Sequence, residues 1–193
     1  MDINPLIFKA YDIRGLYPGE IDEAVAHQIG RAFAAYLRAA RIGVSRDMRV
    51  SSPSLAAAFI DGARLQGADV VDYGMMATDM LYFASVTDRL DGGAQITASH
   101  NPGQYNGIKM VREDAQPLSG DAGIGHIRDM IANGRLPPPA PRRGGISARD
   151  ILAPYVDKVM SFITPAVIQP FNVVADAGSG MAGLVAPKLF ERL

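Results

Sequence analysis

The chain has 193 residues, of which 48% are apolar and 20% charged, with a formal net charge of −1 and no cysteine. This length suffices for one domain of ordinary size and part of a second, and the apolar fraction suffices for a sizeable core. The charge excludes the basic excess of proteins that bind nucleic-acid backbones, and the lack of cysteine excludes disulfides and cysteine-ligated zinc. With no signal-peptide layout and no stretch of about 20 apolar residues, we expect a cytoplasmic protein that does not bind membranes.

Helical and strand-like patterns alternate along the first two thirds of the chain. Helices are predicted over residues 21–41, 52–67, 79–88 and 124–133, with Ser52 and Thr78 as N-caps. Strands are predicted over residues 42–45, 68–73, 93–97 and 107–113. Strands separated by helices indicate a sheet covered on both faces. We therefore predict a three-layer α/β/α domain with a mixed, mostly parallel sheet.

A proline- and glycine-rich segment follows this domain and cannot continue a helix or a central strand. We place the first domain at residues 1–135, a linker at 136–146 and a partial second domain at 147–193. In that last part, Ser147 and Asp150 have the spacing of a capping box before a helix, and residues 171–175 are predicted as a strand before a final helix. One strand and one helix cannot close a core, so we expect the truncated start of a second α/β domain.

The run T-A-S-H-N-P at residues 97–102 leaves the end of an apolar strand, where open α/β sheets form binding crevices. Its Ser99 hydroxyl is followed directly by the ionisable His100, and Lys109 lies on the next strand. This chemistry indicates phosphoryl or acyl transfer through the serine oxygen. The acyl alternative is the weaker one, because no G-x-S-x-G elbow surrounds Ser99. Local chemistry alone favours a solvated turn with a Ser-Asn-Pro signature, because such turns are common.

Other motifs are weaker. Tyr11, Arg14 and Lys9 cluster before the first helix, and an arginine in such a turn can offer a planar fork of donors to a phosphate. The run G-x-G-x-x-G at residues 178–183 is the pattern of dinucleotide-binding turns, although such turns are more often simple connections. The remaining histidines are interpreted as surface residues, and no set of aspartates has the spacing of a metal loop.

Taken in order, these motifs resemble those of the α-D-phosphohexomutases, the phosphomannomutase and phosphoglucomutase group. The matching runs are residues 8–15, 17–18, 45–53, 78, 81–84, 96–102, 105–109 and 174–183. The T-A-S-H-N-P loop followed by Y-N-G-I-K is the most specific of them. Departures are Asp79 where members commonly have proline and Ser45 where glycine is frequent, and both affect the subfamily more than the chemistry.

The resemblance implies a four-domain enzyme that moves a phosphate between C1 and C6 of a hexose through a hexose 1,6-bisphosphate. Ser99 would carry the phosphoryl group, and its phosphate would ligate Mg²⁺ together with aspartates of a second-domain loop that this sequence lacks. His100 and Lys109 are the candidates for proton transfer or for orienting the hydroxyl. Tyr11, Arg14 and Asn101 are assigned to substrate and phosphate binding. Because the other three domains supply the metal, sugar and distal-phosphate loops, the chain alone is expected to be inactive.

The resemblance leaves the sugar open. The serine loop is closer to the mannose and glucose phosphate branch than to the phosphoglucosamine mutases. A non-catalytic relative that binds sugar phosphates, and a dinucleotide-binding domain built on residues 178–183, are the competing hypotheses.

Overall fold

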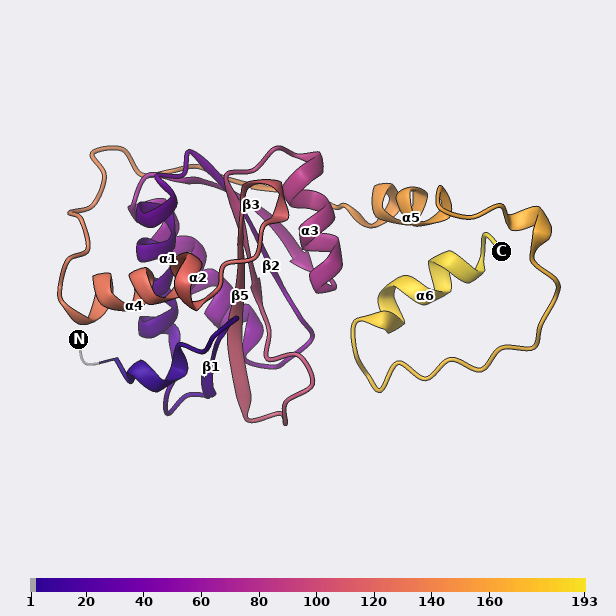
Figure 1. Ribbon diagram of the computed structural model, residues 1–193, viewed down its shortest axis with the longest axis horizontal. Helices are drawn as coiled ribbons and strands as arrows, with labels where there is room; N and C mark the ends of the chain where they lie inside the picture. The colour runs from indigo at the N-terminus through magenta and orange to yellow at the C-terminus, as the bar shows by residue number, and fades with distance from the viewer. Residues whose placement is uncertain (1–2) are drawn as a thin grey trace.

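The protein is described by a computed structural model that covers residues 3–193. Its centre is a six-stranded sheet in the order β1-β5-β4-β2-β3-β6 (Figure 1). The strands are β1 (Ile13–Leu16), β2 (Arg41–Arg46), β3 (Asp69–Met75), β4 (Gly92–Ile96), β5 (Tyr105–Arg112) and β6 (Ile146–Ala148). Strands β4, β2, β3 and β6 are parallel, whereas β5 runs antiparallel to both of its neighbours. The predicted mixed, mostly parallel sheet is therefore confirmed.

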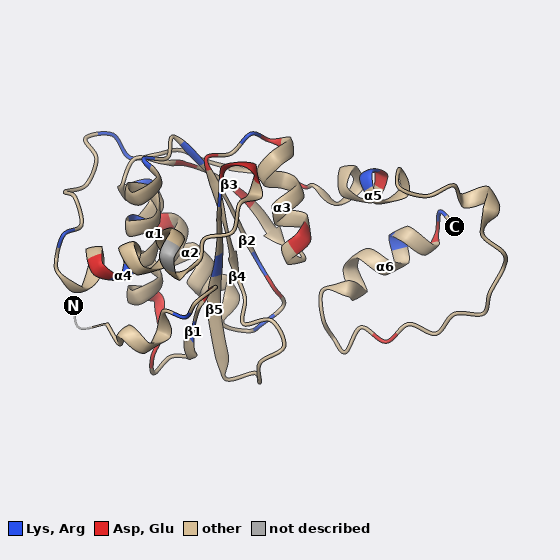
Figure 2. Cartoon of the chain, in the orientation of Figure 1, with Lys and Arg blue, Asp and Glu red and all other residues tan. Residues whose placement is uncertain are grey.

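Helices cover both faces of this sheet (Figure 1). They are α1 (Glu23–Leu37), α2 (Ser52–Leu65), α3 (Thr78–Thr87) and α4 (Gly125–Ala132). Helices α5 (Leu152–Met160) and α6 (Ala182–Phe190) lie beyond the sheet, in the extended C-terminal part of the chain (Figure 1). Buried side chains of α1, α2 and α4 form one core with the sheet, and those of α3 form a second core on the opposite face. Acidic and basic residues are interspersed over these elements (Figure 2).

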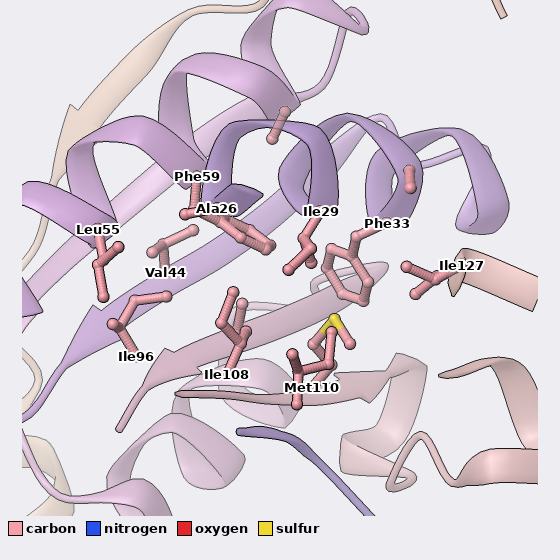
Figure 3. Close-up of a cluster of buried hydrophobic side chains, with 14 of the residues drawn as sticks. Ala26, Ile29, Phe33, Val44, Leu55, Phe59, Ile96, Ile108, Met110 and Ile127 are labelled. Carbon is pink, nitrogen blue, oxygen red and sulfur yellow. The ribbon is translucent and has the colours of Figure 1, made fainter. Parts of the chain in front are cut away.

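The larger core contains the rings of Phe33 on α1 and Phe59 on α2, whose centroids lie 5.8 Å apart (Figure 3). Both side chains are fully buried, as the 3.6-residue apolar spacing of their helices predicts. The two helices approach closely because each has a glycine at the crossing. A Cβ on Gly30 would lie 2.2 Å from the carbonyl oxygen of Phe59, and one on Gly62 would lie 2.0 Å from that of His27.

Replacing Gly30 with alanine is expected to destabilise the protein. Alanine is about 1 kcal/mol better than glycine inside a helix. Here the backbone carbonyl at 2.2 Å forces the helices apart, and we expect a net loss of about 2 kcal/mol or more. Gly19→Ala is the control, because nothing lies within 4 Å of its added Cβ. Urea unfolding gives the free energy of unfolding of both variants. Equal values would contradict the claim that Gly30 is needed for the close approach of α1 and α2.

Helix and strand boundaries differ from the predictions at several places. The N-cap positions are Ser51 and Ala77, one residue before the predicted Ser52 and Thr78, and neither makes a side-chain capping bond. The predicted capping box is wrong, because Ser147 lies in β6, where pairing with β3 competes successfully with local capping. The strand predicted at residues 171–175 is also wrong, because among residues 3–193 this segment pairs with no other strand.

The segment after α4 runs back along the first core. The side chains of Arg31 and Arg64 donate to the carbonyls of Pro137 and Gly144, at 2.8 and 2.9 Å. Further on, Ile151 is buried against the α3 core, and the hydroxyl of Tyr155 donates to Asp79 of α3. Burial and this carboxylate raise the pKa of Tyr155 to about 12. The division into domain, linker and partial domain stays a prediction. None of the helices in residues 3–193 has the length and apolarity needed to span a bilayer.

Candidate functional site

The serine loop lies at the carboxyl edge of the parallel strands. It begins directly after β4, and the turn that begins with Asp47 follows the neighbouring strand β2. The backbone N–H of Asp47 donates to the carbonyl of Ile96 at 3.0 Å, so the two turns leave the sheet side by side. Loops at this edge are where open α/β sheets bind their ligands. The loop therefore has the predicted position at this edge of the sheet, and the binding crevice stays a prediction.

Ser99 is exposed at the tip of this arrangement, in a left-handed backbone conformation with φ of 56°. Residues other than glycine rarely adopt that conformation, and it costs of order 1–3 kcal/mol unless the surroundings hold it. The N–H of Ser99 donates to the hydroxyl of Thr97 at 2.9 Å. The Ser99 hydroxyl oxygen lies 3.2 Å from Nδ1 of His100, whose ring is also exposed. The loop thus brings a hydroxyl and an imidazole into hydrogen-bond distance at the surface.

Asn101, predicted to bind substrate, has a bond within the loop. Its side-chain nitrogen donates to the carbonyl of Ala98 at 2.9 Å, and its backbone N–H donates to the same oxygen at 3.1 Å. This pair closes the turn that follows Ser99. The amide nitrogen is therefore engaged in shaping the loop, and the assignment of Asn101 to substrate binding stays a prediction.

Arg14 and Lys109 lie on the same face of neighbouring strands β1 and β5. Arg14 pairs with Gly107, and side chains alternate along β5, so Lys109 points to the side of Arg14. Asp12, which is 8% exposed, lies between them. Its carboxylate accepts a hydrogen bond from Arg14 and lies 3.9 Å from the ammonium of Lys109. The three charges sum to +1, and Nε of Arg14 is buried without a hydrogen-bond partner among the described residues.

Gly107 connects this cationic cluster to the serine loop. Its carbonyl accepts from the N–H of Thr97 at 2.9 Å, while Arg14 faces it on the other side. A Cβ at this position would lie 2.2 Å from the Ile13 carbonyl and 2.9 Å from the Thr97 carbonyl. Only glycine allows β1, β5 and the start of the serine loop to come this close. Ser99 is two residues beyond that meeting point.

Tyr11 is separate from these contacts. Its side chain is 75% exposed at the entry to β1, next to the buried Asp12. Lys9 is exposed as well, and its backbone N–H donates to the carbonyl of Asp12 at 2.8 Å. The structure therefore places Tyr11 on the surface beside the cationic cluster, and its role at the site entrance stays a prediction.

Sequence reasoning assigned no role to three buried polar residues beneath the loop. They are Asp47 and Arg49, in the turn after β2, and Thr97 at the start of the serine loop. Asp47 is 3% exposed and accepts from the Thr97 hydroxyl at 2.7 Å and from the Ser52 hydroxyl at 2.6 Å. One sequence signal could have indicated these residues. Asp47 and Arg49 directly follow a buried strand, and they therefore lie at the same edge of the sheet as the serine loop.

The other motifs lie away from this edge or make contacts of their own. His27 pairs with Asp61 at 3.4 Å and is partly buried between helices, and His126 is exposed and stacks on Tyr36. Residues 178–181 form a turn and residues 182–183 begin α6, without the preceding strand that the dinucleotide motif requires. Within residues 3–193, no three His, Asp or Glu side chains are grouped as metal ligands would be.

Comparisons with known proteins agree with this geometry. The family model for phosphoglucomutase/phosphomannomutase, alpha/beta/alpha domain I, matches residues 5–136. A phosphomannomutase from Escherichia coli is 41% identical over 187 residues, covering 96% of this chain and 41% of that protein. Phosphohexose mutases of Xanthomonas campestris are 39% identical over 186 residues.

Solved structures give the same result. A phosphoglucomutase/phosphomannomutase family protein from Burkholderia thailandensis superposes with a TM-score of 0.88 at 38% identity, covering 98% of this chain and 42% of that one. A putative phosphomannomutase from Thermus thermophilus, at 24% identity and a TM-score of 0.73, shares the fold. The chain spans about two fifths of the length of the curated relatives it matches.

Proposed function

This chain belongs to the phosphoglucomutase/phosphomannomutase family, and from that premise we propose that it is the phosphoryl-carrying part of a phosphohexomutase, with Ser99 as the carrier. The whole protein would interconvert hexose 1-phosphate and hexose 6-phosphate. The observation that carries the proposal is the exposed Ser99 hydroxyl, 3.2 Å from an imidazole nitrogen, in a loop whose first residue, Thr97, bonds to Gly107, the β5 partner of Arg14.

The reaction would proceed in two transfers. The free hydroxyl of the bound sugar attacks the phosphorus of phosphorylated Ser99, the P–Oγ bond breaks, and a hexose 1,6-bisphosphate is formed. The bisphosphate then turns over in the site, and its other phosphate passes back to the Ser99 oxygen. Each transfer takes a proton from the attacking hydroxyl and returns one to the leaving oxygen. The 3.2 Å distance between Nδ1 of His100 and Oγ supports His100 as the group that would exchange the proton of the serine, with Lys109 as the alternative.

Charge neutralisation is the second requirement. A serine phosphate carries nearly two negative charges at neutral pH, and its transfer depends more on positioning and electrostatics than on covalent chemistry. Arg14 and Lys109 would supply the opposing charge. The buried, unpartnered Nε of Arg14 supports this role, because a donor left without an acceptor is costly and a phosphate oxygen would satisfy it. Tyr11 and Asn101 would border the substrate.

Magnesium is the cofactor that the family resemblance implies. A hard oxygen donor suits this ion, and the phosphate of Ser99 would provide one. The described residues offer no acidic cluster to complete its coordination, so the remaining ligands would come from the rest of the full-length protein. When bound, the ion would neutralise charge on the transferring group. The residues of this chain that act beside it are Ser99, Arg14 and Lys109.

The test is a mutase assay on the full-length protein with the 1-phosphates of mannose, glucose and glucosamine as separate substrates. We expect mannose and glucose phosphates to be converted, and we expect this conversion to depend on a catalytic amount of glucose 1,6-bisphosphate. We also propose that the enzyme is cytoplasmic. If the enzyme converts glucosamine phosphate faster than the mannose and glucose phosphates, it belongs to the phosphoglucosamine mutase branch. Binding of the sugar phosphates without turnover would instead identify a non-catalytic relative and contradict the proposal.

A further inference from the structure

The guanidinium of Arg49 lies beneath the serine loop, with a side chain that is 7% exposed. Its Nη1 donates to the carbonyls of Pro102 at 2.8 Å and Tyr105 at 2.9 Å. Its Nη2 donates to the carbonyls of Ser99 at 3.0 Å and Asn101 at 2.6 Å. One side chain therefore holds four backbone oxygens spread over seven residues of the loop.

Asp47 compensates the buried charge of Arg49. Its Oδ2 lies 3.2 Å from Nε of Arg49, within ion-pair distance although poorly aligned for a hydrogen bond. The same oxygen accepts from the Thr97 hydroxyl, which in turn accepts from the N–H of Ser99. The loop is thus held from two directions, at the Ser99 carbonyl by Arg49 and at the Ser99 N–H through Thr97. These two bonds fix both peptide planes around the strained φ of Ser99.

Arg49 has no donor left for a phosphate. A guanidinium has five N–H groups; here four bond to carbonyls and the fifth faces Asp47. Its effect must therefore pass through the loop backbone. In a trans peptide the N–H points opposite to the C=O. Turning the carbonyls of Ser99 and Pro102 toward Arg49 points the N–H groups of His100 and Gly103 to the other side. Because the four loop carbonyls point toward Arg49, their partially negative oxygens do not face an anionic phosphoryl group on Ser99.

We propose that Arg49, held in place by Asp47, is a positioning residue for the phosphoserine loop. This inference rests on the proposed function of Ser99 and deepens it. Arg49 holds the backbone so that the Ser99 oxygen and the N–H groups of the loop face the phosphoryl group. Lysine cannot replace it, because one ammonium nitrogen has three donors and lacks the planar fork that reaches four carbonyls.

Arg49→Lys in the full-length protein tests the proposal, with Arg46→Lys as the matched control. Arg46 is the last residue of β2 and makes none of these loop contacts. We expect kcat to fall roughly 10²-fold for Arg49→Lys, the cost of misplacing a reacting group by about 1 Å, while KM changes by less than about threefold. The control should retain normal kcat. Assays well below the unfolding temperature separate this loss from a loss of folded protein.

Hydrogen exchange of the Ser99 amide gives a readout that needs no turnover. The N–H is bonded to Thr97 in the wild type and should be protected there and in Arg46→Lys, but should exchange at least about tenfold faster in Arg49→Lys. Unchanged exchange together with kcat within about threefold of wild type would overturn the proposal. If the Ser99 amide of the wild type is protected but the protein has no mutase activity, the proposed function is wrong, whereas the inference that Arg49 holds the serine loop is still supported.

A second pair of variants covers the case in which Arg49→Lys does not fold. Thr97→Val removes the hydroxyl that links Asp47 to the Ser99 N–H, and Thr97→Ser retains it. We expect a lower kcat and faster Ser99 amide exchange for valine, with both restored toward wild type by serine. Equal values for the two variants would contradict the role assigned to this connection.

Discussion

Ser99→Ala is expected to abolish mutase turnover of the full-length protein, lowering kcat on the order of 10⁴-fold or more, because the variant has no oxygen to carry the phosphoryl group. The folded state should change little. Ser99 is exposed, and among residues 3–193 its hydroxyl lies within hydrogen-bond distance of His100 alone. Alanine at φ of 56° meets a cost similar to that of serine. We therefore expect the free energy of unfolding to change by less than about 1 kcal/mol.

The matched control is Ser161→Ala, another exposed serine, whose hydroxyl donates to the Lys158 carbonyl at the end of its own helix. Its turnover should equal that of the wild type. Coupled assays of both variants at saturating bisphosphate give the comparison. Retention of more than about one tenth of wild-type kcat by Ser99→Ala would show that another residue carries the phosphate.

Asp47→Asn is expected to be the most destabilising of these substitutions, by about 3–5 kcal/mol, because it leaves the guanidinium of Arg49 buried without a compensating charge. The amide keeps the shape of the carboxylate, so the loss reports on charge and hydrogen bonding rather than on a cavity. The hydroxyls of Ser52 and Thr97 donate to different oxygens of this carboxylate. Asparagine has only one of these acceptors, because its amide nitrogen donates and does not accept.

Asp61→Asn is the control, because it removes a carboxylate whose ion pairs are exposed to solvent rather than buried. Asp61 pairs with His27 and Arg143, but its side chain is 50% exposed, and exposed ion pairs contribute about 0–1 kcal/mol. Urea unfolding of the two variants should therefore differ by at least about 2 kcal/mol. Equal losses would mean that the Asp47–Arg49 pair contributes no more than a surface pair, and the loop would need another source of rigidity.

The four inner strands and most helices could be predicted from the sequence because their signal is local, whereas the edge strands β1 and β6 were not predicted. The apolar spacing of α1 and the buried run of β2 appear within one window of residues, and the strand-helix alternation then indicates the layers. Errors occurred where tertiary pairing decides. Ser147 has a capping spacing but lies in β6, because the edge of β3 offers it backbone partners.

The candidate site was predicted only in part, for the same reason. The motif around Ser99 predicts the carrier role through its resemblance to a family, whereas local chemistry favours a plain turn. The contacts that hold the loop join residues about 50 positions apart, such as Asp47 with Thr97 and Arg49 with Asn101. Spacing along the chain carries no sign of such pairs. They become visible once β2 and β4 are neighbours in the sheet.

Phosphopeptide mapping after incubation with glucose 1,6-bisphosphate is the most direct test of Ser99 as the phosphoryl carrier. The full-length protein should gain one phosphate, located on Ser99, and should lose it again when a hexose monophosphate is added. The Ser99→Ala variant should gain none. A phosphate located on another residue while Ser99 stays unmodified, or turnover with no phosphorylated enzyme at any time, would contradict the carrier role.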